Sequence, residues 1–175
     1  HKVTCVDNDT NKVAKINNGD TPIYENGLDE LLKVHIGKRL TVTTNLSDAI
    51  ITSEVSLLAV GTPFNGVEID LKYIRQVVMQ IGEVLREKDD YHVVIIKSTV
   101  VPGTTDDVVI PLLEEYSGKT AGKDFGVGMN PEFLREGSAI NDFMNPDRFV
   151  LGGIDTRTKQ VMRNLYEDFH GIDVL

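Results

Sequence analysis

Two carboxylates stand four residues apart in the segment 130–137, which reads Asn-Pro-Glu-Phe-Leu-Arg-Glu-Gly. An asparagine can cap a helix and a proline suits its first position, so the pattern predicts a helix over 132–140. That helix would place Glu132 and Glu136 on one face, where like charges repel by roughly a few tenths of a kcal/mol. A polar ligand or a reacting water bound between them would offset the repulsion, and a solvated acidic face is the alternative.

Polar residues also follow two predicted strands further upstream. The triplet Gly-Thr-Pro occupies 61–63, and Lys-Ser-Thr occupies 97–99. Glycine permits close backbone approach and the Thr62 hydroxyl can bond to a ribose or a pyrophosphate, although Gly and Pro equally favour a plain turn. Thr99 stands at a strand tip, where it could hold a water or a substrate oxygen. Ligands of open α/β sheets bind at the carboxyl ends of the strands, so we expect these tips and the 130–137 segment to converge on one site.

The elements that must position these residues alternate along the chain, because short β-branched runs are followed by longer amphipathic ones. This alternation is typical of an α/β protein with a doubly wound, mostly parallel sheet of the Rossmann type, here in one layered unit. We predict strands near 2–6, 40–43, 55–60, 92–97, 125–129 and 148–152, and helices near 9–18, 27–35, 45–52, 70–88, 104–116, 132–140 and 155–169.

The first predicted strand ends in Asp7, whose carboxylate can accept hydrogen bonds from both ribose hydroxyls of the adenosine half of NAD. Capping of the following helix is an equally good interpretation of Asp7. Lys12 lies within reach of the same ribose, unless it is simply solvated. In a dinucleotide-binding βαβ unit a strand ending in such an acid is the second one. We therefore expect residues 1–175 to be a partial NAD-binding domain that lacks its first strand and Gly-rich turn.

Composition argues against several classes of function. The formal net charge of −9 disfavours nucleic acid and anionic membranes as partners, because both reward clustered Lys and Arg. The single cysteine, Cys5, and the lack of a signal peptide favour a cytoplasmic protein. The longest apolar runs are too short to cross a bilayer, and the four histidines show no paired spacing, so we expect no metal site.

Several short motifs occur in a fixed order along the chain: Val6-Asp7 with Lys12, Thr-Pro-Ile-Tyr-Glu at 21–25, Gly27-Leu28, 61–63, 97–99, Pro-Gly-Thr-Thr at 102–105, 130–137 and Pro146-Asp147-Arg148. Together they resemble the UDP-glucose/GDP-mannose dehydrogenase family over essentially all 175 residues. Any one of these motifs is weak evidence for the family, but the Lys-Ser-Thr triplet together with the 130–137 octapeptide is highly specific for it. Asn26 departs from the proline usual in the Glu-Pro-Gly-Leu segment of the family.

The resemblance implies the N-terminal NAD-binding domain of a nucleotide-sugar 6-dehydrogenase. Such an enzyme oxidises the C6 alcohol of UDP-glucose or GDP-mannose to the uronate in two NAD-dependent steps, through a cysteine thioester. The cysteine, a central helix and a C-terminal domain belong to later parts of the family's chain, and the full-length enzyme is expected to form a homodimer or a higher homo-oligomer. We expect negligible turnover from these 175 residues alone.

By motif position, the resemblance also assigns roles to individual residues. Thr99 corresponds to the threonine that helps to hold the reacting water, and Glu132 to the general base for hydrolysis. Glu136 corresponds to the glutamate beside the nicotinamide and the substrate, so the catalytic set is Glu132, Thr99 and Glu136. The Phe133-Leu134 backbone corresponds to part of the sugar pocket. The positions that match cofactor contacts are Asp7, Lys12, Thr62, Thr99 and Glu136.

Other interpretations of the sequence stay open. UDP-glucose is preferred over GDP-mannose as the substrate only because it occurs more widely. A 3-hydroxyacid-type dehydrogenase shares the βαβ pattern but leaves the Glu132 and Glu136 pair unexplained. A non-catalytic, Rossmann-like nucleotide-binding module is the alternative from a different class of function.

Overall fold

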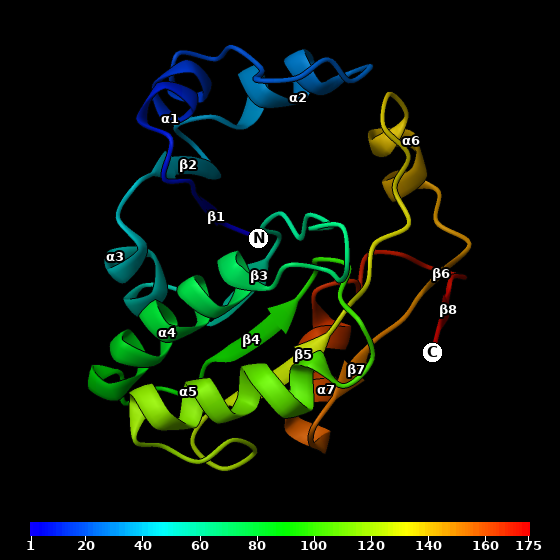
Figure 1. Cartoon of the computed structure of the whole chain (residues 1–175). Helices are drawn as coiled ribbons and strands as arrows, with labels where there is room; N and C mark the ends of the chain where they lie inside the picture. Colours follow the sequence, from blue (N-terminus) through cyan, green and yellow to red (C-terminus); the bar gives the residue numbers. More distant parts are fainter. The chain divides into compact units, whose positions relative to one another are not determined.

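The computed structural model describes residues 1–175, which divide into two compact units (Figure 1). The smaller unit contains His1–Ala49 and Phe133–Pro146, and the larger unit contains Ile50–Glu132 and Asp147–Leu175. The alternation of strands and helices along the sequence does not reveal this division.

The smaller unit is built on a pair of parallel strands. Its elements are β1 (Val3–Val6), α1 (Thr10–Asn17), α2 (Leu28–His35), β2 (Leu40–Thr43), the start of α3 (Leu46–Ile51), and α6 (Ala139–Met144). Strand β1 pairs with β2 in parallel, with Val3 opposite Leu40. Helix α1 begins where the sequence predicts it, because the Asp9 carboxylate accepts hydrogen bonds from the first-turn amides.

The larger unit contains a four-stranded sheet in the order β3-β4-β5-β7. The first three strands are parallel, and β7 is antiparallel to β5. Its elements are β3 (Val55–Leu58), α4 (Lys72–Glu87), β4 (Val93–Ile96), the π-helical turn η1 (Thr105–Val109), α5 (Ile110–Ser117), β5 (Gly126–Met129), β6 (Arg148–Phe149), β7 (Gly152–Gly153), α7 (Thr156–Asn164) and β8 (Asp173–Val174). A separate parallel pair joins β6 to β8.

Strand β4 is the centre of the core of this unit, and all four of its residues are buried. Val93 and Ile95 pack in one cluster with Met162 and Tyr166, so the alternation of side chains along a strand turns the other two residues to the opposite face. Helices α4 and α5 run side by side and α7 packs on β5 (Figure 1). The α4–α5 approach is close: a Cβ at Gly82 would lie 2.7 Å from the Cβ of Tyr116. The fully buried strand is what a parallel sheet covered on both faces requires.

The three parallel strands of the larger unit end level with one another. Leu58 lies opposite Ile96, and Ile96 lies opposite Met129. Each of the three is the last residue of its strand, so the loops that follow leave the sheet at the same edge. This register confirms that the carboxyl ends of the three strands converge.

The predicted helix over 132–140 is wrong. Residues 131–135 form no regular structure, a turn follows at 136–137, and helix α6 begins only at Ala139. Glu132 and Glu136 therefore do not share a helix face. Two smaller differences concern the 148–152 strand, which is split into β6 and β7, and the 104–116 helix, which begins with the π-helical turn η1.

The side chain expected to cap that helix has another role. Asn130 is only 1% exposed, and its amide donates a hydrogen bond to the Val150 carbonyl at 3.0 Å. Its side-chain oxygen accepts a hydrogen bond from the buried Tyr166 hydroxyl. These bonds connect the end of β5 to Val150 and to Tyr166. The Asn130 side chain is therefore engaged in the core and does not cap a helix here.

A buried polar network lies at the opposite, amino-terminal end of β4. His92 is fully buried, with Nε2 2.8 Å from the Ser56 hydroxyl and Nδ1 3.1 Å from the Ser53 carbonyl. Lys88 is 7% exposed and donates hydrogen bonds to backbone carbonyls, including that of Ile50 at 2.8 Å. Burial, with the nearby Lys88 charge, lowers the pKa of His92 to about 4. The imidazole is therefore neutral in the folded protein at neutral pH.

We expect His92 to make the free energy of unfolding depend on pH. The unfolded histidine, with a pKa near 6.5, binds more protons than the folded one between about pH 4 and pH 6.5. Stability contributed by the neutral imidazole is thus lost as the pH falls through that window, by about 2 kcal/mol between pH 6.5 and pH 5. Urea unfolding of wild type and His92→Gln across pH 5–7.5 measures this difference, with exposed His170→Gln as the control. Parallel stability curves for wild type and H92Q would contradict it.

A second prediction concerns the anchor at the end of β5. Tyr166→Phe removes the hydrogen bond from the Tyr166 hydroxyl to the buried Asn130 side-chain oxygen, and should lower the free energy of unfolding by about 1–3 kcal/mol. Tyr73→Phe, at a side chain that is 46% exposed, is the matched control and should change stability little. A loss below about 0.5 kcal/mol in Y166F, within the range of ordinary surface substitutions, would show that the bond is not an anchor.

Candidate functional site

The loops after β3 and β4 are joined to each other at the carboxyl edge of the sheet. The Thr62 hydroxyl donates a hydrogen bond to the Thr99 carbonyl at 2.8 Å. The Ser98 hydroxyl lies 2.6 Å from the Val60 carbonyl and 3.2 Å from that of Leu58, and it donates to both. Thr62 and Thr99 are thus brought together as the sequence predicts. The Thr62 proton is engaged in this bond, so its oxygen would meet a ligand as an acceptor.

The loop after β5 brings Glu132 to the same edge, where Lys97 follows β4. Glu132 is exposed, and Lys97 is partly buried with Nζ 3.5 Å from the Pro131 carbonyl oxygen. Burial lowers the pKa of Lys97, and the negative charge of Glu132 opposes that shift. A cation therefore stands beside the candidate base. No role was predicted for Lys97 from the sequence. Its position directly after a buried apolar strand could have indicated one.

In the smaller unit, Asp7 and Lys12 form an ion pair at the end of β1, with Oδ2 and Nζ 2.7 Å apart. The hydrogen bond from Lys12, followed by one from the Asp9 amide, lowers the pKa of Asp7. The carboxylate is therefore ionised at neutral pH. The residue that caps α1 is Asp9, whose Oδ1 accepts the Asn11 amide at 2.9 Å. Asp7 itself receives the Asp9 amide at 2.9 Å.

These residues fit one part of NAD. An ionised, partly exposed carboxylate at a strand end suits the two ribose hydroxyls of adenosine, which are hydrogen-bond donors. In the larger unit, a Cβ placed on Gly61 would meet no atom within 4 Å, so the backbone there is open to close approach by a ligand. Within the smaller unit, Asp7 and Lys12 would hold this ribose.

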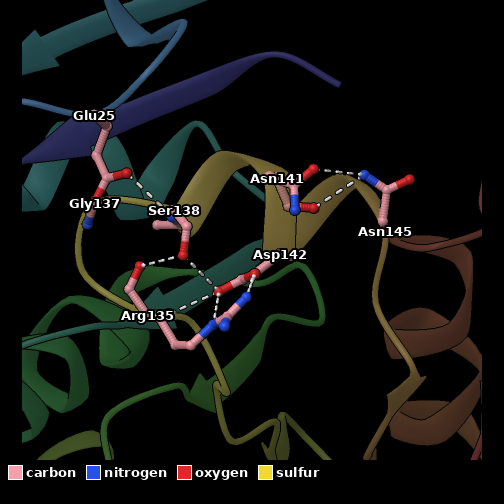
Figure 2. Close-up of polar contacts among 8 residues, drawn as sticks. Glu25, Arg135, Gly137, Ser138, Asn141, Asp142 and Asn145 are labelled. Atoms are coloured by element: carbon pink, nitrogen blue, oxygen red, sulfur yellow. Dashed lines mark hydrogen bonds and ion pairs between the residues drawn. The ribbon is translucent and has the colours of Figure 1, made fainter.

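The segment that follows Glu132 is held by hydrogen bonds within the smaller unit (Figure 2). Arg135 pairs with Asp142 at 2.7 Å, and its backbone amide also donates to that carboxylate at 3.0 Å. The guanidinium and this amide hold the pKa of Asp142 well below its usual range. Glu25 is 8% exposed and accepts hydrogen bonds from the Gly137 amide at 2.7 Å and the Ala139 amide at 3.0 Å.

The predicted site residues thus form three groups. Thr62, Thr99 and Glu132 gather at the carboxyl edge of the sheet in the larger unit. Asp7 with Lys12 forms the second group, and the third is the segment from Phe133 to Glu136, both in the smaller unit. Phe133 is 65% exposed and Leu134 is partly buried. Glu25 and Tyr166, which hold these segments, were not identified as site residues from the sequence.

The described residues 1–175 contain neither a metal-binding cluster nor a membrane-spanning helix. No group of three or more His, Cys, Asp or Glu side chains is arranged to hold a metal ion. None of the helices has the length and apolar character needed to cross a membrane.

Curated proteins similar to this chain include GDP-mannose and UDP-glucose 6-dehydrogenases. The chain is 46% identical to GDP-mannose 6-dehydrogenase of Azotobacter vinelandii over 171 residues, which cover 96% of this chain and 39% of that protein. It is 44% identical to UDP-glucose 6-dehydrogenase of Haloferax volcanii over 167 residues, covering 95% of this chain and 39% of that protein. The chain therefore spans about two-fifths of the length of these curated relatives.

Solved structures of GDP-mannose and UDP-glucose dehydrogenases have the same fold as this chain. A ternary complex of GDP-mannose dehydrogenase from Pseudomonas aeruginosa superposes with a TM-score of 0.95 and 44% identity, over 100% of this chain and 40% of that one. This likeness confirms the Rossmann-type α/β fold. Residues 1–170 match the model of the UDP-glucose/GDP-mannose dehydrogenase family, NAD binding domain. The chain belongs to the UDP-glucose/GDP-mannose dehydrogenase family and forms its NAD-binding domain.

Proposed function

We propose that the full-length protein containing this chain is an NAD-dependent nucleotide-sugar 6-dehydrogenase. The observation that carries the proposal is the level ending of β3, β4 and β5, which gathers Thr62, Thr99 and Glu132 at one edge of the sheet. Ligands bind at this edge in open α/β sheets. The family of the chain and the names of its relatives support the same activity.

The residues at this edge suit the hydrolytic half of such a reaction. Oxidation of a primary alcohol to a carboxylate removes two hydrides, which NAD accepts, and adds one oxygen from water. Glu132 is the base that takes a proton from this water, and Thr99 orients the water by a hydrogen bond. Lys97 supplies a positive charge beside the developing anion. A cysteine thioester as the species hydrolysed is part of the proposal, with the cysteine supplied from outside these residues.

The substrate is a hexose linked to a nucleoside diphosphate. GDP-mannose is the first sugar to assay, because relatives named for it are 46–47% identical to this chain. UDP-glucose follows, since relatives named for it are 44% and 38% identical. In the smaller unit, Glu136 contacts the nicotinamide and the substrate, and the Phe133-Leu134 backbone contacts the sugar.

The cellular setting is also part of the proposal. A single cysteine, Cys5, supports a reducing cytoplasmic compartment. The family resemblance supports a homo-oligomeric enzyme, a dimer or larger. A non-catalytic nucleotide-binding module is the competing function, and the assays below separate the two.

A substitution at Gly61 tests the cofactor site. Gly61→Ala should leave the free energy of unfolding within about 0.5 kcal/mol, because the added methyl group meets no protein atom. It should weaken NAD binding about tenfold or more if the cofactor approaches this backbone closely, as measured by calorimetric titration of the full-length protein. Gly152→Ala, where a Cβ would make only ordinary contacts, is the matched control. Unchanged NAD affinity in G61A would place the cofactor elsewhere.

The activity itself is tested with the full-length protein, NAD and a panel of nucleotide sugars. We expect two NADH for each uronate formed, and a loss of about 10²–10⁴-fold in the rate of uronate release for Glu132→Gln. Glu115→Gln, at another exposed glutamate, is the control. If no sugar supports NADH formation, the binding module is the better description. If E132Q releases uronate at the wild-type rate, Glu132 is not the base.

A further inference from the structure

We infer that Glu25 is a positioning residue for Glu136, an inference that rests on the function proposed above. Glu25 belongs to the loop before α2 and is separated from its partners by more than a hundred positions in the sequence. Neither the family match nor the names of the relatives assigns it a role. Glu25 and the two residues whose amides it binds all belong to the smaller unit.

Both carboxylate oxygens of Glu25 are engaged with backbone. Oε1 accepts the Gly137 amide at 2.7 Å, and Oε2 accepts the Ala139 amide at 3.0 Å (Figure 2). The side chain is 8% exposed, so these amides replace the water that an exposed carboxylate would bind. Hydrogen bonds to an ionised acceptor are about twice as strong as neutral ones. The carboxylate thus acts as a two-point clamp on the start of α6.

The clamp acts on the backbone directly attached to Glu136. The Gly137 amide belongs to the peptide plane that follows the Glu136 Cα, and Glu25 fixes that plane. The preceding plane is fixed as well, because the Arg135 carbonyl accepts the Ser138 amide at 3.0 Å. Gly137 has φ +83°, a left-handed conformation that other residues rarely adopt. Glu136 therefore lies in a turn whose two flanking peptide planes are each held by a hydrogen bond.

A second clamp acts on the residue before Glu136. Asp142 of α6 accepts hydrogen bonds from the Arg135 amide and from Nε of the same residue, both at 3.0 Å. Helix α6 is thus held by Glu25 at its start and in turn holds Arg135 (Figure 2). Loss of the Glu25 contacts would release both ends of the turn. A carboxylate that must meet a sugar and a nicotinamide at hydrogen-bond distance would lose that placement, and misplacement by about 1 Å can cost about a hundredfold in rate.

Glu25→Gln is the sharpest substitution, because it keeps the size of the side chain but turns an amide donor toward one of the two backbone donors. Glu25→Asp keeps the charge and shortens the reach, and it serves as the second variant if E25Q folds poorly. Glu30→Gln, at an exposed glutamate of α2, is the matched control. All variants are made in the full-length protein.

The first readout is hydrogen exchange at the Gly137 and Ala139 amides, which needs no activity. We expect both amides to be protected from exchange in the wild type and in E30Q. In E25Q their protection factors should fall at least tenfold. The second readout is a double-mutant cycle with Glu136→Gln. We expect E25Q to lower kcat about 10–100-fold in the wild-type background and less than threefold when Glu136 is already replaced.

Each result decides something. Unchanged exchange in E25Q overturns the clamp, whether or not the protein is active. Equal losses of kcat in the two backgrounds show that Glu25 supports the fold rather than Glu136, and overturn the inference. If the wild-type protein is inactive with every nucleotide sugar, the proposed function is overturned, and so is the positioning role of Glu25 in catalysis. The hydrogen-exchange result still shows whether Glu25 holds the Gly137 and Ala139 amides.

Discussion

The in-register pairing of β3, β4 and β5 is the constraint on which the candidate site depends. Because Leu58, Ile96 and Met129 lie in one row, three polar loops leave the sheet at the same level. A slip of one residue would turn the buried side chains of β4 to the wrong face, and the apolar packing around Val93 and Ile95 opposes it. Burial of apolar side chains therefore fixes the placement of Thr62, Thr99 and Glu132, none of which is itself in the core.

A second layer of control comes from polar residues that hold irregular backbone. Asn130 and Tyr166 fix the end of β5 just before Glu132, and Glu25 fixes the turn just after Glu136. Asn130 donates to the Val150 carbonyl, and Glu25 accepts the Gly137 and Ala139 amides. These side chains thus satisfy backbone groups outside a helix or a strand. The candidate carboxylates can thus leave regular structure and still have defined positions.

These two layers differ in how well the sequence predicts them. The strand positions and the helix near 70–88 follow from periodicity. The structure confirms β2 and helix α4, in which Ile74, Val78 and Ile81 are buried. The prediction of a helix over 132–140 was wrong, and it relied on Asn130 as the cap. The Asn130 side chain instead accepts a hydrogen bond in the core from Tyr166, which lies far along the chain. The role of Glu25 depends on a contact across 112 positions, which no local pattern contains.

We propose that the carboxyl edge of the β3-β4-β5 sheet binds the cofactor. Amide chemical shifts of the isotope-labelled full-length protein, recorded during titration with NAD, locate the binding surface. We expect shifts at Gly61, Thr62 and Thr99, and none at Glu54 and His92 at the opposite ends of β3 and β4. Shifts confined to that opposite end, or a saturating titration that leaves Gly61, Thr62 and Thr99 unchanged, would show that the cofactor binds elsewhere.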